Sequence, residues 1–228
     1  MATAAGLHRR DAVFGVALAA VSGRSLAAGS DADAAAGIRA ALERGAGAAV
    51  STLGRADGFL GNPKVRIGLP QGLDSAARLL EMTGQKQRVD DLVTAMNRAA
   101  EAAVPKAKPL LVQTAKSISV QDAWQIVRGS DTSVTEYFAA HTRAPLTEQL
   151  LPIVTKETEK VALADKYNAV AGKAAGLGLI QGEDSNIQRY VTRRALDGLY
   201  LMIGEEEKRI RADPVGTGSA ILRQVFGR

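Results

Sequence analysis

The chain contains no cysteine and only two histidines, His8 and His141. Without cysteine it has no disulfide, no thiolate nucleophile and no cysteine-based zinc or iron–sulfur site. A histidine-rich metal site or a Ser-His-Asp triad would have to use His141, because His8 lies in an N-terminal leader. The position of His141 shortly before Pro145 predicts the last turn of a helix, where a histidine interacts favourably with the helix dipole. We therefore expect neither a metal nor a cofactor.

Aromatic residues are also scarce: they make up 4% of the chain, whereas hydrophobic residues make up 46%, and alanine supplies many of these. Such thin side chains suit closely packed helices better than a β-sheet, which favours β-branched and aromatic residues. The chain has 228 residues, and about 100 to 200 residues is usual for a domain with one core. We predict an all-α fold, with a single multi-helix, bundle-like domain over residues 34–228.

No block of consecutive basic residues is present, although the formal net charge is +5 and the sequence pI is near 9.6. Part of that charge comes from Arg9, Arg10 and Arg24 in the leader, where only Asp11 opposes them. Tails that bind nucleic acid or anionic membranes carry blocks of like charge. Nucleic acid is therefore not an expected partner.

Long hydrophobic runs are missing as well. The N-terminal segment carries the Arg9-Arg10 pair, then a weakly apolar run over residues 13–21, then several small residues. This order is typical of a secretory signal peptide, and the arginine pair resembles a twin-arginine signal. The apolar run is shorter than the roughly 20 residues that cross a bilayer. We interpret residues 1–28 as a cleaved signal peptide, without a transmembrane anchor, and predict a periplasmic mature protein.

Apolar residues recur at helical spacing through most of the remaining chain. Ser119 and Asp122 match a capping box, which predicts the start of a helix, and Gly129 suits the left-handed position that ends one. Pro145 is expected to separate two helices, and Pro152 to kink the second. The expected helices cover residues 34–53, 73–82, 86–104, a stretch after Ser119, a stretch up to His141, and residues 146–161, 163–175, 185–212 and 218–226.

Glycines and prolines recur through residues 55–70 and exclude a continuous helix there. The segment is also rich in apolar side chains, so we expect a long ordered loop that packs on the helices, here called the strap. A connection of this length is more often functional than a plain link between helices. Its candidate ligand-binding residues are Asp57, Phe59, Asn62 and Arg66.

Three consecutive acids occur near the end of the last long helix. The spacing places the middle one, Glu206, on an apolar stripe, with Glu205 and Glu207 flanking it. A buried carboxylate needs a partner such as Arg98 or Lys106, or a raised pKa. The alternative is a solvated acidic face that pairs along the helix with nearby arginines.

Asn97 and Glu101 lie four residues apart on one edge of a helix, and Asp197 lies beside apolar neighbours on another. With Glu206 they are candidates for an inter-helical polar cluster. Such a cluster could bind a ligand or a hard cation, or it could fix the register of the core through hydrogen bonds. The Glu-x-x-His motifs of di-iron bundles are absent, and we predict no metal site.

Seven short motifs occur along the chain: DGFLGNP at residues 57–63, VRIGLP at 65–70, MNRAAE at 96–101, AVPKAKP at 103–109, YVT at 190–192, ALDGL at 195–199 and EEEK at 205–208. Their order resembles that of the bacterial domain-of-unknown-function family 4197. The resemblance covers about residues 37–226, nearly the whole mature chain. It implies an exported helical domain, often found with a signal or lipoprotein leader, and it implies no activity, cofactor or catalytic residue.

Three functional hypotheses fit these observations, and a non-enzymatic role is favoured because no phosphate-binding loop or nucleophile motif is present. The leading hypothesis is a periplasmic or envelope module that binds an apolar small molecule or lipid in a groove edged by the strap. The second is an enzyme or cation-binding protein whose Glu101, Asp197 and Glu206 converge in one pocket. The third is a structural or oligomerising envelope protein that binds a partner protein or a second copy through an apolar surface.

Overall fold

Every regular element that the structure describes is a helix. The computed structural model describes residues 24–70, 82, 84, 86–160, 164–165, 167–168 and 186–213. The all-α prediction is confirmed for these ranges, and within them no helix is long and apolar enough to cross a membrane. In chain order the elements are α1 (Arg24–Leu53), α3 (Lys86–Ala103), the 3-10 helix η1 (Val104–Ala107), α4 (Lys108–Ser117), α5 (Val120–Arg128), α6 (Ser133–Thr158) and α8 (Ile187–Ala212).

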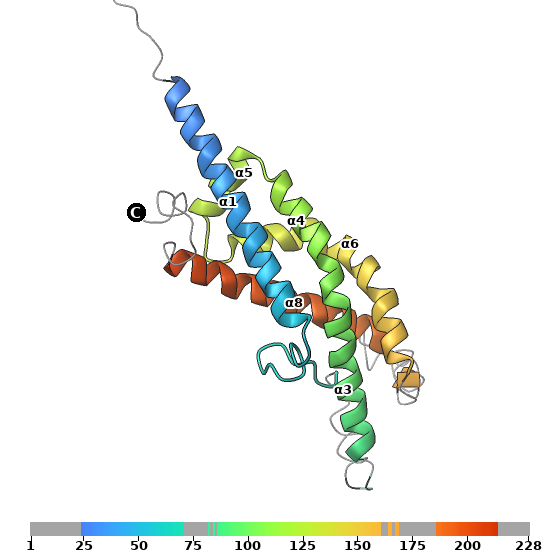
Figure 1. The fold of residues 1–228 in the computed structure, drawn as a ribbon. Helices are drawn as coiled ribbons and strands as arrows, with labels where there is room; N and C mark the ends of the chain where they lie inside the picture. Colours follow the sequence, from blue (N-terminus) through green and yellow to red (C-terminus); the bar gives the residue numbers. More distant parts are fainter. Residues whose placement is uncertain are drawn as a thin grey trace, which may run out of the picture.

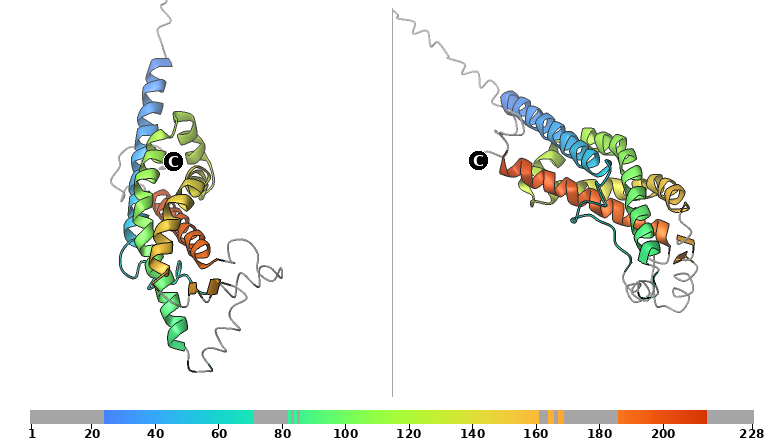
Figure 2. Two further views of the ribbon diagram at one scale, coloured as in Figure 1. Left: turned by 90° about the vertical axis from the view of Figure 1, so that its right-hand side faces the viewer. Right: turned by 60° about the horizontal axis from the view of Figure 1, so that its bottom comes forward.

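The helices form an elongated bundle (Figures 1 and 2). Helix α6 packs on α3 and α8, while α1 packs on α4, α5 and α8. Alanines such as Ala35, Ala46 and Ala49 are buried in α1 and let neighbouring helices approach closely. One continuous apolar core joins α1, the strap, α3, α6 and α8.

Helix α1 begins ten residues earlier than the sequence predicted, at Arg24 instead of residue 34. The added segment is rich in alanine, which has the highest helix propensity of all residues. Residues 1–23, with most of the predicted signal peptide, lie outside the described residues. The expected helices over residues 73–82, 163–175 and 218–226 also lie outside them, apart from a few single positions.

Helix α5 is short, and it is fixed at its start by the predicted capping box. The Asp122 amide donates to Ser119 Oγ (3.0 Å), and the Ser119 amide donates to Asp122 Oδ2 (3.3 Å). Arg39 of α1 donates from Nε to the Ile118 carbonyl (2.7 Å), just before this cap. The expectation for Gly129 is wrong: the residue is extended (φ −78°, ψ −171°), not left-handed, so the chain leaves α5 directly toward α6.

Helix α6 runs through both Pro145 and Pro152, so the predicted break at Pro145 is wrong. His141 is therefore not in a last turn; its ring stacks on Tyr137, with 4.1 Å between the ring centroids. A proline inside a helix costs about 3 kcal/mol, and here a buried, mostly apolar stripe with a residue at every fourth position offsets this cost by packing on the bundle. Its buried members are Val134, Phe138, Thr142, Leu146, Leu150, Val154 and Thr158.

Helix α8 matches the predicted span of residues 185–212 to within two residues. Asn186 caps its start by accepting a hydrogen bond from the Arg189 amide (3.0 Å). The helix is buried on several faces, as expected for a central element. It therefore contacts the strap, α1, α3 and α6, and carries side chains that hold these elements together.

Candidate functional site

Asn97 of α3 attaches the strap to the bundle, and its side chain is fully buried. Its Oδ1 accepts a hydrogen bond from the Ile67 amide (2.8 Å), and its Nδ2 donates to the Ile67 carbonyl (2.8 Å). Nδ2 also donates to the Val93 carbonyl, one turn earlier in α3 (2.7 Å). Buried backbone groups need partners, so one side chain fixes the position of the strap on α3.

Glu101, one turn after Asn97, holds the first half of the strap. Its Oε1 accepts hydrogen bonds from the amides of Phe59 (3.0 Å) and Leu60 (3.1 Å). Arg98 donates from Nη1 to Glu101 Oε2 (2.6 Å) and from Nη2 to Asp57 Oδ1 (2.8 Å). Its hydrogen bonds to Glu101 first, and to Asp57 second, raise the pKa of Arg98 above its ordinary value. These contacts form one network, in which the charged groups of Glu101 and Arg98 bind the strap and each other.

The apolar side chains of the strap fill the space between α3 and α8. Phe59 is fully buried and Val65 nearly so. A Cβ added at Gly198 of α8 would lie 2.8 Å from Phe59 Cε1 and 3.2 Å from Val65 Cβ, so only glycine allows this approach. Tyr190 Oη donates to the Gly68 carbonyl (3.0 Å) from the same helix. The space predicted to form a groove beside the strap is thus occupied by the strap itself.

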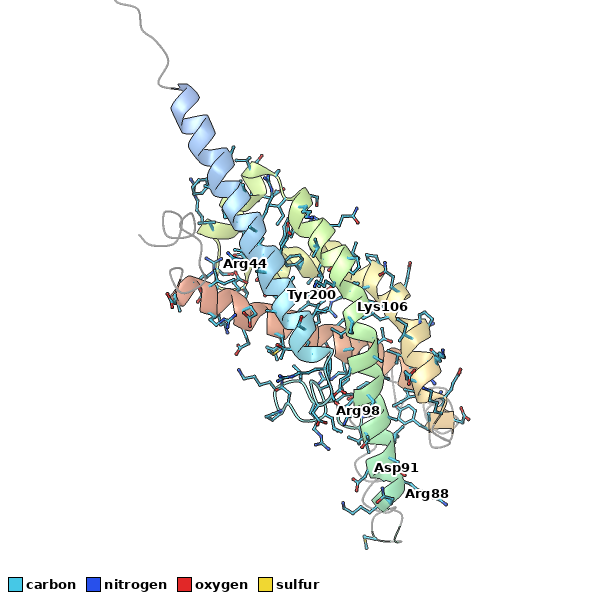
Figure 3. All side chains as sticks on the ribbon, in the orientation of Figure 1. Arg44, Arg88, Asp91, Arg98, Lys106 and Tyr200 are labelled. Carbon is cyan, nitrogen blue, oxygen red and sulfur yellow. The ribbon has the colours of Figure 1, made fainter. Side chains whose placement is uncertain are left out.

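The other predicted residues near the strap make local contacts. Asn62 Oδ1 accepts from the Lys64 amide (3.1 Å) within a turn, and Arg66 donates from Nη1 to the Leu60 carbonyl (3.4 Å) at the surface. Lys106 is exposed in η1, and Figure 3 shows it further up the row formed by α3 and α4 than Arg98. Neither Asn62, Arg66 nor Lys106 joins the network around Glu101.

Asp197 of α8 lies in a different cluster, between α8 and α6. Arg143 of α6 donates from Nη1 to Asp197 Oδ1 (2.9 Å). Arg193 and Arg194 of α8 place their Nη1 atoms 3.8 Å and 3.9 Å from Asp197 Oδ2. The Arg143 guanidinium also lies over the Tyr200 ring, 4.8 Å from its centroid. Three arginines therefore surround one carboxylate.

The buried acid of the Glu205–Glu207 run is Glu207, so the placement of Glu206 on the apolar stripe is wrong. The Glu207 side chain is 2% exposed, whereas that of Glu206 is 15% exposed and pairs with the surface residue Arg209. The reason is helical phase: Glu207 lies four residues after Ile203 and three before Ile210, and both are buried. Neither Arg98 nor Lys106 is the partner of Glu206.

Glu207 caps a helix to which it does not belong. The amides of Val134 and Thr135 in the first turn of α6 donate to Glu207 Oε1 (3.2 Å) and Oε2 (3.3 Å). Thr132 is the N-cap residue of α6, and its own side chain makes no capping hydrogen bond. The first amides of a helix lack partners within it, and a carboxylate at that end also favours the helix dipole.

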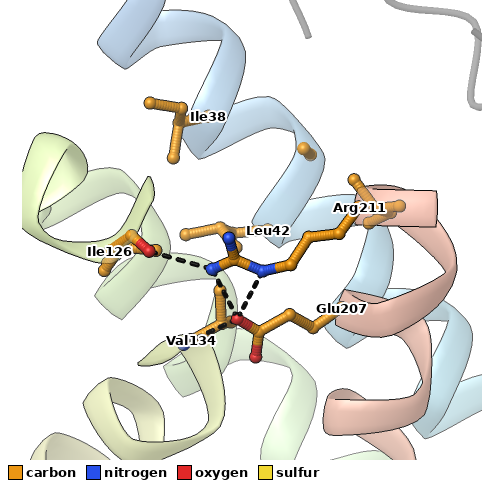
Figure 4. Close-up of a pocket in the computed structure, with 8 residues that line it drawn as sticks. Ile38, Leu42, Ile126, Val134, Glu207 and Arg211 are labelled. Atoms are coloured by element: carbon orange, nitrogen blue, oxygen red, sulfur yellow. Dashed lines mark hydrogen bonds and ion pairs between the residues drawn. The ribbon is translucent and has the colours of Figure 1, made fainter. Parts of the chain in front are cut away.

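Arg211, one turn after Glu207, caps the other kind of helix end: it binds carbonyl groups in the last turn of α5 (Figure 4). It donates from Nη2 to the Ile126 carbonyl (2.9 Å) and from Nη1 to the Val127 carbonyl (3.2 Å). Nη2 also donates to Glu207 Oε1 (2.9 Å). This pair, the Glu207–Arg211 clasp, gives an anion to the start of α6 and a cation to the end of α5. Sequence analysis missed it, although the spacing from Ile203 to Glu207 and Ile210 was visible.

The cavity beside the clasp is small, at about 20 Å³. A cavity needs about 10–15 Å³ to hold one water molecule, so this one has no room for a lipid or a drug-sized ligand. Apart from the clasp, its lining is apolar: Ile38, Ala41, Leu42, Ile126, Val134 and Ile210.

The three carboxylates of the catalytic hypothesis each pair with a separate arginine, on α3, between α6 and α8, and near the end of α8. Within the described ranges no group of three acidic or histidine side chains could hold a metal ion. The structure thus assigns separate structural partners to Glu101, Asp197 and Glu206, and does not bring them together around one reacting group.

A larger hollow lies on the outward-facing side of α5, with a volume of about 580 Å³. Its lining residues are Gln121, Trp124, Gln125, Arg128 and Gly129, and the first four share one helix face at spacings of three and four. Trp124 is the only tryptophan of the chain, and the Arg128 guanidinium lies 5.3 Å from its ring centroid. Trp124 is half-buried at the edge of the hollow.

One comparison with known proteins gives a match. The family model described as "Protein of unknown function (DUF4197)" matches residues 28–227. No curated protein and no solved structure matches the chain.

Proposed function

This chain belongs to the DUF4197 family of proteins of unknown function, and from that premise we propose that it is an exported, non-enzymatic module that binds an amphiphilic small molecule or lipid at the outward-facing side of α5. The observation that carries the proposal is the position of Trp124. In a chain this poor in aromatic residues, the only tryptophan edges an open hollow and is not enclosed in the core.

The chemistry of the hollow matches an amphiphile. Trp124 supplies a large apolar surface, and Val120, one turn earlier on α5, is 38% exposed. Arg128 supplies a cation, and Gln121 and Gln125 supply amide donors and acceptors. Tryptophan suits such sites because one side of its ring system is apolar and its N–H is polar. A ligand with an apolar part and an anionic or hydrogen-bonding head uses both kinds of surface.

The size of the hollow supports a small ligand. Its volume of about 580 Å³ lies within the roughly 300–1,000 Å³ range of known ligand pockets. The cavity beside the clasp is far smaller. The hollow on α5 is thus the better candidate of the two.

The absence of converging carboxylates in the described residues favours binding over catalysis. Glu101 holds the backbone of the strap, Asp197 pairs with Arg143, and Glu207 caps α6. A general acid or base must reach the proton that it transfers, and these oxygens already accept hydrogen bonds from the protein. The sequence features of residues 1–28 support export to the periplasm, where lipids and other amphiphiles are available.

Native mass spectrometry of the mature protein purified from the periplasm tests the proposal. We expect a bound amphiphile, or its uptake from a total lipid extract, with a defined stoichiometry. Trp124→Ala should abolish this binding, whereas Leu201→Ala should not, because Leu201 is an exposed apolar residue of α8 (44% exposed) outside the hollow. A ligand-free mass, or equal binding by both variants, would contradict the proposal.

A further inference from the structure

The arginine cluster around Asp197 is only partly used by contacts within the described chain. Arg143 makes the one short hydrogen bond to this carboxylate, at 2.9 Å. The Arg194 Nη1 atom lies 3.9 Å from Asp197 Oδ2, which is beyond hydrogen-bond distance. The attraction between Arg194 and Asp197 is therefore electrostatic, and a closer acceptor could still bind this guanidinium.

Arg194 has a second unusual feature. Its Nε atom is buried, and among the described residues it is the one buried side-chain nitrogen or oxygen without a hydrogen-bond partner. A buried donor without a partner destabilises a protein, so such groups are rare in folded proteins and each one calls for an explanation. The rest of the side chain reaches the surface, since 42% of it is exposed. An acceptor from solution can thus approach the terminal nitrogens of this guanidinium, while the Nε atom stays covered.

Local charge and geometry favour an anion as that acceptor. Arg143 comes from α6 and Arg194 from α8, and both side chains are close to half-exposed, at 43% and 42%. The single carboxylate of Asp197 does not balance two guanidinium groups. The contact of Arg143 with the Tyr200 ring, at 4.8 Å, further fixes its position. Two positioned guanidinium groups form a site to which an oxyanion is attracted from solution.

We propose that Arg143 and Arg194 form a binding site for a phosphate group, either free phosphate or the phosphate of a lipid headgroup. The two terminal nitrogens of a guanidinium can donate a pair of hydrogen bonds to one oxyanion. A phosphate has enough oxygens to accept from two arginines on different helices at once. Asp197 positions Arg143 and weakens binding by its negative charge.

This site is independent of the proposed amphiphile site, because it uses α6 and α8 and no residue of α5. Calorimetric titration of the full chain with inorganic phosphate, at low ionic strength in a phosphate-free buffer, tests it. We expect saturable binding that Arg194→Gln weakens by about tenfold or more, as loss of a bidentate charged contact does. Arg189→Gln, an exposed arginine on α8, is the matched control for net charge and should leave the affinity unchanged.

Two further variants separate binding from folding. Arg194→Lys keeps the charge but loses the paired donors, and should bind phosphate more weakly than the native protein. Asp197→Asn removes the opposing charge and should bind phosphate more tightly, provided that circular dichroism shows a native helix content. A purely structural salt bridge would give no such gain.

Vesicles of phosphatidylglycerol, compared with vesicles of a neutral glycolipid, identify the source of the phosphate. Binding to either inorganic phosphate or phosphatidylglycerol that depends on Arg194 supports the site. No binding in both arms, or equal weakening by Arg194→Gln and Arg189→Gln, would overturn it.

Discussion

The backbone amide of Val134 donates to Glu207 Oε1 at 3.2 Å, across 73 residues of sequence. The first turn of α6 is thus capped by a side chain of α8, and Arg211 on the next turn of α8 binds the last carbonyls of α5. One pair of charged residues on a third helix therefore joins the end of α5 to the start of α6. Because the hollow is built on α5, its position on the bundle depends on the clasp.

Glu207→Ala is expected to lower the free energy of unfolding by about 3 kcal/mol, because it leaves Arg211 and the amides of α6 without their partner. Glu206→Ala removes a pair with the exposed Arg209 and should cost less than about 1 kcal/mol. Urea unfolding followed by circular dichroism measures both. Equal losses of stability in the two variants would mean that Glu207 does not stabilise the junction between α5 and α6.

Asn97→Ala should lower the free energy of unfolding by about 2 kcal/mol, because both backbone groups of Ile67 lose a buried partner. Asn62→Ala, which removes a surface contact to the Lys64 amide, is the control and should have a smaller effect. Hydrogen exchange gives the local measurement: the Ile67 amide should exchange faster in Asn97→Ala. Unchanged protection at Ile67 would show that Asn97 does not hold the strap.

Gly198→Ala is expected to destabilise the protein by about 1–3 kcal/mol through overpacking against Phe59 and Val65. Gly47 of α1 provides the opposite case, since a Cβ there meets nothing within 4 Å. Gly47→Ala should stabilise the protein by about 0.5–1 kcal/mol through helix propensity. Thermal unfolding measures both, and a stabilising Gly198→Ala would contradict the described packing of the strap.

Alkaline pH is expected to destabilise the fold through Tyr200. Burial raises the pKa of this phenol above its ordinary value near 10. A raised pKa in the folded state contributes stability that is present below pH 10 and is lost as the pH rises through the folded-state pKa. The free energy of unfolding should therefore fall above about pH 10, and less steeply in Tyr200→Phe. Parallel pH profiles for the two proteins would exclude this role.

Much of the fold follows from local sequence. The cap at Ser119 and the span of α8 were predictable because capping residues and helical spacing act over a few neighbouring residues. The break at Pro145 was predicted wrongly, because the packing that carries α6 through its prolines comes from α3 and α8. Local propensity cannot include that contribution.

The candidate site was less predictable. Asn97 and Glu101 were identified on one edge of a helix, and Arg98 as a possible partner of a buried acid. The structure has all three on α3, where Asn97 and Glu101 bind the backbone of the strap and Arg98 binds Glu101. Glu206 was predicted in place of Glu207 because the apolar stripe was taken to include Met202 as well as Ile203 and Ile210. Met202 is only half-buried, and consecutive helical positions differ by about 100°, so including it moved the stripe by one residue. The hollow on α5 could not be predicted, since it depends on which helix face the bundle leaves uncovered.

The fluorescence of Trp124 tests the central claim most directly, because no other tryptophan contributes to the signal. The full chain would be titrated with lysophosphatidylglycerol below its critical micelle concentration. A saturable blue shift is predicted, with affinity weakened about fivefold by Arg128→Gln, as expected for one exposed charged contact. Lys156→Gln, an equal charge change on α6, should have no effect. An emission spectrum that does not change, or that changes equally in both variants, would contradict the assignment of α5 as the binding surface.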